Sequence, residues 1–194
     1  KINNRHTVYF LILLKPSILL ITILLQKLHY YGLRDKTLQW FSSYLSNREQ
    51  YTVIGDTLSE VGYVKCGIHQ GSVLGPLLFL LYINDITASS DIVKFFLFAD
   101  DTTVFYKNEP NLQNEQILNY ELEKVSQWLA ASKLSLNVSK SNFMILTNQK
   151  KKLKERTNNN IKINNTLIKE KVVTKYLGTF IDNKLNWKIH IQTS

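Results

Sequence analysis

The sequence contains one cysteine, three prolines and seven glycines in 194 residues. A single cysteine, Cys66, excludes an internal disulfide framework and a zinc site built from several cysteines, and it suits a reducing compartment. So few prolines and glycines exclude collagen-like and low-complexity chains. Acidic residues are also scarce, because 24 Lys and Arg stand against 15 Asp and Glu, which gives a net charge of +9. This balance favours a polyanionic partner, nucleic acid before membrane.

The length fits one ordinary domain or a piece of a larger one, and the start at Lys1 is typical of a fragment. An apolar fraction of 44% is enough for a packed core. Segments with helical periodicity and segments with strand character are mixed without regular alternation, which predicts the α+β class. The main elements expected are helices over 24–31, 77–86 and 112–133, strands over 49–54, 61–66, 92–99, 102–106, 143–146 and 172–181, and a hairpin over 161–168 that turns at Asn164-Asn165.

Residues 8–25 form the one long hydrophobic segment, VYFLILLKPSILLITILL. Its length approaches that of a membrane span, although Lys15-Pro16 in the middle would be costly there. A signal peptide is a second reading, but no small-residue cleavage site follows. A buried strand followed by a helix is the third reading, and a membrane-anchored protein remains an alternative at this point.

The segment FFLFADDTTVFY places Asp100 and Asp101 between two apolar strand halves. One interpretation is a hairpin whose tip carries aspartates because Asp tolerates turn geometry. The other is a metal site, because carboxylate oxygens are the natural ligands of Mg²⁺. Adjacent residues of a strand point to opposite faces, so a third carboxylate from a neighbouring strand is expected for two-metal chemistry.

A glycine-rich loop precedes the most apolar helix. Gly67, Gly71 and Gly75 recur at intervals of four, which allows close approach of another molecule, and Gln70 and Ser72 offer hydrogen bonds. The alternative is a helix start with small residues for packing. The loop is not a Walker loop, because no Gly-Lys-Ser/Thr follows.

Four segments in this order, HQGSVLGPLLFLLYINDI, FFLFADDTTVFY, WLAASKLSLNVSKSNFMIL and KYLGTFIDNKLNWKIHI, resemble the reverse transcriptase of a non-LTR, jockey-like retrotransposon. The resemblance covers residues 22–191 almost continuously. It implies a partial right-hand polymerase palm with incomplete fingers and no thumb. By this resemblance residues 1–23 are a degraded first palm strand, 24–147 the palm core, and 148–194 a basic loop, hairpin and primer-grip-like edge.

The resemblance also implies roles for individual residues. Asp100 and Asp101 would be catalytic metal ligands, and Lys140 would lie near the nucleotide phosphates and serve as a proton donor to pyrophosphate. The nucleotide and template pocket would be lined by Gln70, Gly71, Ser72, Phe98 and Ala99, with His69 where the family usually has proline. Tyr176, Leu177 and Gly178 would form the primer grip. The implied cofactor is Mg²⁺ or Mn²⁺, the implied partners are an RNA template, a DNA primer and deoxynucleoside triphosphates, and the implied location is the nucleus or cytoplasm.

Other features have simpler readings as well. Eleven Lys and Arg stand against two acidic residues between Lys133 and Lys175, which fits either a solvated loop and hairpin or phosphate contacts along a duplex. Lys140 taken alone reads as a solvated lysine. Trp40, Trp128 and Trp187 are expected to anchor the core rather than stack on bases, and Cys66 is expected to be a small buried residue.

The pattern breaks at the first catalytic motif. The family usually reads close to FLDLSKAFDTVNHNILL before the segment that here is ILLQKLHYYG, whereas this chain reads FLILLKPSILLITILL and has no acidic residue from Lys1 to Arg34. Codons for Lys-Ala-Phe-Asp-Thr-Val-Asn-His, read one base later, can spell Lys-Pro-Ser-Ile-Leu-Leu-Ile-Thr, which is residues 15–22. Our hypothesis is that residues 10–23 are an out-of-frame copy of this motif and that the chain is inactive as written.

This hypothesis makes a prediction about the neighbouring reading frame of the encoding DNA. Sequencing the gene and transcript over residues 10–25 is expected to show an Ala-Phe-Asp-Thr-like motif in the neighbouring frame. A neighbouring frame without such a motif would make the hydrophobic segment a genuine feature of the protein and would reopen the membrane and divergent-enzyme readings.

Overall fold

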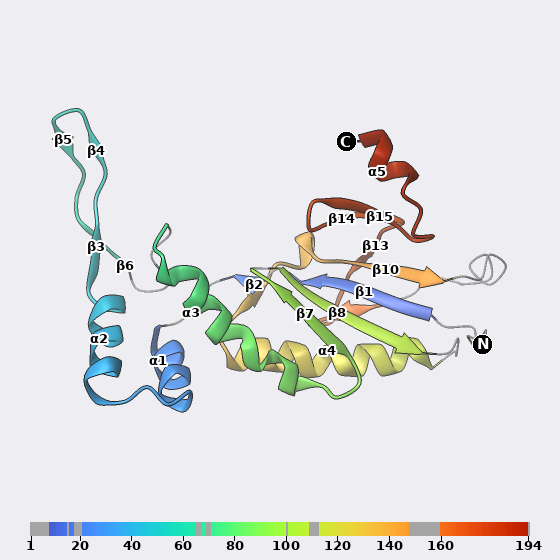
Figure 1. The fold of residues 1–194 in the computed structure, drawn as a ribbon, viewed down its shortest axis with the longest axis horizontal. Coiled ribbons are helices and arrows are strands. Elements are labelled where there is room, and N and C mark those ends of the chain that lie inside the picture. The colour runs from blue at the N-terminus through green and yellow to red at the C-terminus, as the bar shows by residue number, and fades with distance from the viewer. Residues whose placement is uncertain are drawn as a thin grey trace.

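A five-stranded sheet forms the centre of the computed structural model, which describes residues 8–14, 16–17, 21–64, 67–68, 71–99, 101–108, 113–147 and 160–193. The strand order is β13-β10-β1-β8-β7 (Figure 1). All neighbouring pairs are antiparallel except β10 and β13. The bounds are β1 Val8–Leu14, β7 Lys94–Phe98, β8 Asp101–Asn108, β10 Asn142–Thr147 and β13 Lys169–Glu170.

The hydrophobic N-terminal segment folds as a strand and a helix. β1 is the middle strand of the sheet, paired with β8 from Val8 to Leu14 and with β10 from Val8 to Leu13. Helix α1, Ile21–Tyr30, follows and buries Leu24 and Leu28. This confirms the reading as strand followed by helix. In the described parts of the chain, no helix is long and apolar enough to cross a membrane.

Helices cover one face of the sheet. α3 (Leu74–Ile83) continues into the 3₁₀ helix η1 (Asn84–Ser89), and α4 (Asn114–Ala131) comes after β7 and β8; Figure 1 shows α4 running beneath the strands. The core joins alternate residues of the sheet to α4, namely Val104, Tyr106, Phe143 and Ile145 with Leu118, Leu122, Val125 and Leu129. On β7 the other alternate positions, Lys94, Phe96 and Phe98, are exposed. One face of the sheet is therefore packed against helices, while the opposite face is exposed along the edge strand β7 but buried at Thr103 and Met144 of the inner strands.

Lys27 fastens α1 to the helices that cover the sheet. Its Nζ donates to the Tyr82 carbonyl and to Asp85 Oδ1, each at 2.6 Å. The same ammonium lies 4.8 Å from the Tyr82 ring centroid and 4.7 Å from that of Trp128, within cation–π range. The side chain of Lys27 is only 14% exposed, so these contacts are largely shielded from water. One lysine thus connects α1 with α3, η1 and α4.

Replacing Lys27 with methionine keeps much of its length but removes both hydrogen bonds and the charge over the two rings. We expect Lys27→Met to lower the free energy of unfolding by about 1–3 kcal/mol, measured by urea denaturation. Lys36→Met, at an exposed position of α2 (Asp35–Leu45), is the matched control and should change stability by less than about 0.5 kcal/mol. Equal effects of the two substitutions would contradict the role assigned to Lys27.

A long hairpin arm projects from the body beyond α2 (Figure 1). β3 (Arg48–Gln50) pairs with β6 (Gly62–Val64), and β4 (Val53–Ile54) pairs with β5 (Thr57–Leu58) at the tip. The expected strand over 49–54 is thus two short strands, and the one over 61–66 is confirmed as far as Val64, beyond which Lys65 and Cys66 lie outside the described residues.

Short elements complete the C-terminal part. β2 (Pro16–Ser17) pairs with β9 (Ser135–Leu136), and the 3₁₀ helix η2 (Val138–Lys140) leads into β10. The expected hairpin is β11 (Lys162–Ile163) and β12 (Thr166–Leu167), and Asn164 and Asn165 both have positive φ at its turn, as a two-residue hairpin turn requires. The last elements are β14 (Val173–Tyr176), β15 (Thr179–Asp182) and α5 (Lys188–Thr193). The strand region expected over 172–181 is confirmed as two strands, because positive φ at Leu177 and Gly178 turns the chain back on itself between them.

Candidate active site

The acidic segment forms a tight hairpin between β7 and β8. Phe98 pairs with Asp101, so that only Ala99 and Asp100 connect the two strands. Ala99 has a φ of +49°, a turn conformation. Asp101 is half-buried at the start of β8, Phe98 is exposed, and Asp100 lies outside the described residues. The hairpin predicted for this segment is confirmed.

Lys140 lies at the same end of the sheet as this hairpin. It is exposed in η2, two residues before β10 begins. Because β1 is antiparallel to both β8 and β10, the starts of β8 and β10 lie at one end of the sheet. Only β1 separates these strands, so they are about 10 Å apart. Asn137 fixes the turn, since its Oδ1 accepts from the Lys140 amide at 3.2 Å and from Ser139 Oγ at 2.7 Å.

The strand between these residues does not supply the third carboxylate. Leu13 pairs with Thr103 and Leu14 with Thr102, which places leucines beside the acidic hairpin. Thr102 Oγ1 is buried and has no hydrogen-bond partner among the described residues, and a leucine opposite it offers none. No group of three His, Cys, Asp or Glu suited to a metal occurs in the described ranges. The sequence of β1 thus holds no acidic residue that could join Asp101 in binding a metal.

The glycine loop positions the start of α3. Gly71 has a φ of +81°, which favours glycine, although a Cβ there would meet nothing within 4 Å. Ser72 Oγ accepts from the Gly75 amide at 3.0 Å and so caps the first turn of α3. Of the loop residues assigned by resemblance, His69 and Gln70 lie outside the described residues. The observed contact of Ser72 is structural, and its nucleotide contact stays a prediction.

The segment predicted as a primer grip is the turn between β14 and β15. Leu177 and Gly178 have φ values of +46° and +85°, and Tyr176 pairs with Thr179 across the turn. A buried hydrogen bond of 3.2 Å from Thr174 Oγ1 to Asn142 Oδ1 ties this hairpin to the start of β10. Since β10 begins beside η2, this bond brings Thr174 close to the segment that carries Lys140. The sequence did not predict the contact between Asn142 and Thr174. Its only indication was that each of these polar residues lies in a strand next to apolar residues.

We expect Thr174→Val to loosen this connection. The substitution keeps the side-chain shape but deprives the buried Asn142 Oδ1 of the Thr174 hydroxyl, at a cost of about 1–3 kcal/mol in the free energy of unfolding. The measurement is urea denaturation of both single variants and the double variant with Asn142→Leu. The double variant should lose less stability than the sum of the singles. Strict additivity would show that the two side chains are not coupled.

Two of the three tryptophans contradict the expectation that they anchor the core. Trp187 is 65% exposed and Trp40 is 53% exposed. Trp40 lies on the surface of α2, where its ring stacks on Tyr44 at 5.3 Å and an interplanar angle of 8°. Trp187 lies outside the core, immediately before α5. Only Trp128, half-buried against the core and under Lys27, fits the expectation.

Two comparisons with known proteins give matches that cover most of the chain. The family described as Reverse transcriptase (RNA-dependent DNA polymerase) matches residues 20–181, so the match begins after β1. The chain is 29% identical over 167 residues to the "Probable RNA-directed DNA polymerase from transposon X-element" of Drosophila melanogaster, covering 84% of this chain and 17% of that protein. It is 27% identical over 158 residues to the "RNA-directed DNA polymerase from mobile element jockey" of Drosophila melanogaster, covering 77% of this chain and 16% of that protein.

A jockey polymerase of Drosophila funebris is 25% identical over 166 residues, covering 82% of this chain and 18% of that protein. The chain thus spans about a sixth of the length of these relatives. The family match covers far more than half of the chain, and it includes the glycine loop, the acidic hairpin and the segment around Lys140. The chain therefore belongs to the reverse transcriptase family and is related to the polymerases of the jockey and X-element mobile elements.

Proposed function

We propose that this chain is the palm region of an RNA-directed DNA polymerase that binds primer–template nucleic acid but does not transfer nucleotides as written. The observation that carries this proposal is the end of the sheet where β8 and β10 begin. Asp101 begins β8 and Lys140 precedes β10 at this end, Thr174 bonds to Asn142 there, and the intervening strand β1 ends in Leu13 and Leu14. These positions support a palm that keeps groups able to bind nucleic acid while its first strand has no acidic residue.

The roles in the proposal follow the family resemblance. Asp100 and Asp101 are the remaining ligands for Mg²⁺ or Mn²⁺, and Lys140 contacts the phosphates of the incoming deoxynucleoside triphosphate. Gln70, Gly71 and Ser72, with Phe98 and Ala99, line the nucleotide and template pocket, and the Tyr176–Gly178 turn holds the DNA primer. The exposed Phe98 and Lys140 are accessible for such contacts.

The proposed loss of nucleotidyl transfer has a simple physical cause. Two-metal nucleotidyl transfer depends on carboxylates that position both ions and neutralise phosphate charge. Two adjacent aspartates at a hairpin tip lack the third carboxylate that would come from the neighbouring strand. Leucine cannot replace it, since its side chain has no atom that binds a cation.

The test is primer extension and binding with the same DNA primer annealed to an RNA template. We expect the chain to bind this duplex, measured by fluorescence anisotropy, and to give no extension in Mg²⁺ above that of Asp100→Ala. Extension that Asp100→Ala abolishes would instead identify a working polymerase with a divergent metal site. Failure of the folded chain to bind the duplex would overturn the proposed function.

A further inference from the structure

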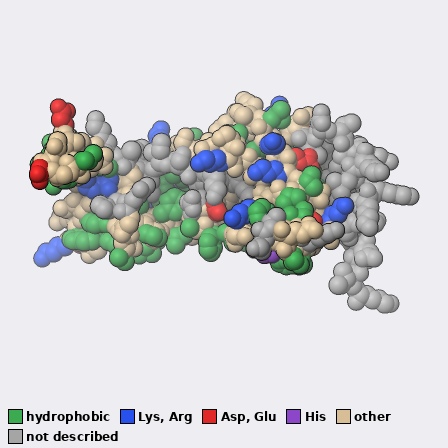
Figure 2. All heavy atoms as spheres, turned by 90° about the horizontal axis from the view of Figure 1, so that it is seen from above, with side chains coloured by type: hydrophobic (Ala, Val, Ile, Leu, Met, Phe, Trp, Pro, Cys, Tyr) green, Lys and Arg blue, Asp and Glu red, His purple; other side chains and the backbone are tan. Residues whose placement is uncertain are grey.

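A C-terminal patch made of Val172, Leu177, Leu185, Trp187 and Ile191 exposes large hydrophobic side chains. All five belong to the β14–β15 hairpin, α5 or the turns beside them. Seen from the side of the molecule that carries these elements, Lys and Arg side chains gather around hydrophobic ones (Figure 2). No element of the described residues covers the patch. The side chains in and around it therefore indicate which kind of partner it binds.

The charge around the C-terminal patch points to a polyanion. Six lysines occur between residues 160 and 193, and the two acidic residues in this range are Glu170 and Asp182. Asp182 is buried, and its Oδ1 accepts from the amides of Lys184 at 3.0 Å and Asn186 at 2.8 Å. Its carboxylate is thus engaged with the backbone rather than displayed at the surface. Exposed aromatic and aliphatic groups among lysines combine stacking surface with phosphate contacts, which is the combination that binds single-stranded nucleic acid.

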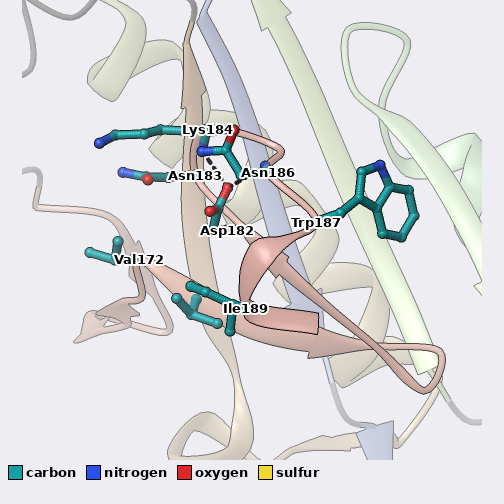
Figure 3. A pocket seen from close by; sticks show the side chains of 8 residues that line it. Val172, Asp182, Asn183, Lys184, Asn186, Trp187 and Ile189 are labelled. Atoms are coloured by element: carbon teal, nitrogen blue, oxygen red, sulfur yellow. Dashed lines mark hydrogen bonds between the residues drawn. The ribbon is translucent and has the colours of Figure 1, made fainter. Parts of the chain in front are cut away.

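Trp187 is held on a fixed backbone with its ring accessible. The two hydrogen bonds to Asp182 fix the turn that leads to Trp187, and the Trp187 carbonyl accepts from the Ile191 amide at 3.0 Å in the first turn of α5. In Figure 3 the indole stands apart from the other labelled side chains. The His190 ring lies 6.1 Å from the indole centroid and is tilted by 57°, so it does not stack on the indole.

A cavity of about 780 Å³ borders the same tryptophan. Its lining combines the apolar Val172, Val173 and Ile189 with the polar Asn183, Lys184 and Asn186 (Figure 3). The Asn183 amide donates to the Val172 carbonyl at 2.9 Å, so these two lining residues are joined through their backbones. Amide side chains beside an apolar wall can hydrogen-bond the edge of a base whose face is stacked.

We propose that the C-terminal patch binds an unpaired stretch of nucleic acid, with Trp187 stacking on a base and the neighbouring lysines contacting phosphates. This inference rests on the proposed function as a nucleic-acid-binding palm and adds to it a site for unpaired strands that shares Leu177 with the primer-grip-like turn. Stacking is available to every base, so the site selects unpaired strands over duplex and not one sequence over another. The site lies beside the primer-grip-like turn, where an unpaired end of a primer or template can reach it.

The experiment compares a short single-stranded oligo(U) with a blunt RNA–DNA duplex of equal length, each labelled for fluorescence anisotropy. We expect Trp187→Ala to weaken single-strand binding by about tenfold and duplex binding by less than about twofold. Trp187→Phe, which keeps an aromatic ring, should recover most of the affinity. Trp40→Ala is the matched control, because Trp40 is also exposed but lies on α2 and already stacks on Tyr44.

Each outcome decides between the two proposals. Duplex binding with single-strand affinity unchanged in Trp187→Ala would overturn the stacking site and leave the proposed function standing. No binding of either nucleic acid by the folded wild-type chain would overturn both. A dimer seen by light scattering that Trp187→Ala dissociates, with nucleic-acid affinity unchanged, would assign the C-terminal patch to protein association and overturn the stacking site.

Discussion

Primer extension should rise by several orders of magnitude when residues 10–22 are replaced by FLDLSKAFDTVNHN, the segment typical of the family. The replacement returns a carboxylate to the strand beside the acidic hairpin, and two-metal transfer loses most of its rate when a bridging carboxylate is absent. The measurement is extension of a DNA primer on an RNA template in Mg²⁺ by the restored chain and by the chain as written. The restored chain carrying Asp100→Ala must be inactive, which shows that the recovered activity belongs to this site.

The single substitution Ile12→Asp serves as a comparison for the replacement of the whole segment. Aligning FLILLK with FLDLSK places Ile12 at the aspartate, yet its partners in the sheet, Val104 and Phe143, are fully buried on the helix-covered face. We expect Ile12→Asp alone to lower stability without restoring activity, because its strand partners Val104 and Phe143 belong to the hydrophobic core. Replacement of the whole segment lets the strand take the register that its own side chains favour. A folded, restored chain with no extension would contradict the view that β1 is the missing part.

Removing three lysines near the palm edge should change the salt dependence of duplex binding strongly. Lys169, Lys171 and Lys175 are all exposed on or beside β13 and β14. Each lysine that contacts a phosphate contributes about 0.9 to the slope of log affinity against log salt. The triple replacement by glutamine is therefore expected to lower the magnitude of this slope by up to about 2.7.

Anisotropy titrations between about 50 and 200 mM salt give the slope directly. Lys36→Gln, on α2 far along the chain, serves as the control for loss of one positive charge and should leave the slope unchanged. Lys171→Gln alone removes one positive charge at the palm edge and is compared directly with Lys36→Gln. An equal change for Lys36→Gln and Lys171→Gln would mean that net charge, rather than a defined binding face, sets the affinity.

Local sequence chemistry predicted the parts of the fold that depend on neighbouring residues. Asn164-Asn165 marked a hairpin turn because asparagine tolerates positive φ, and the spacing of Leu118, Leu122, Val125 and Leu129 marked the buried side of α4. The acidic hairpin was predicted for the same kind of reason. The resemblance to the reverse transcriptases is confirmed, whereas the roles of individual site residues and the domain bounds stay predictions.

The rest depends on contacts between distant segments. The Thr174–Asn142 hydrogen bond joins residues 32 apart, and neither side chain signals the other in the sequence. Trp187 was expected in the core because large aromatic residues usually anchor one, but the Asp182 turn holds it outside. The strand over 172–181 was interrupted by a turn at Leu177, which has an ordinary apolar side chain and an unusual backbone conformation.

The central position of β1 has a consequence for how a cell would treat this protein. Pairing with β8 and β10 uses backbone groups that every residue other than proline possesses, and an apolar segment is accepted in the middle of a covered sheet. Chaperones and proteases recognise exposed apolar surface and unfolded backbone, not the loss of a metal ligand. Under the proposed function, a chain whose first motif is out of frame would pass such surveillance, compete for the same primer–template as the intact polymerase, and inhibit it by occupancy.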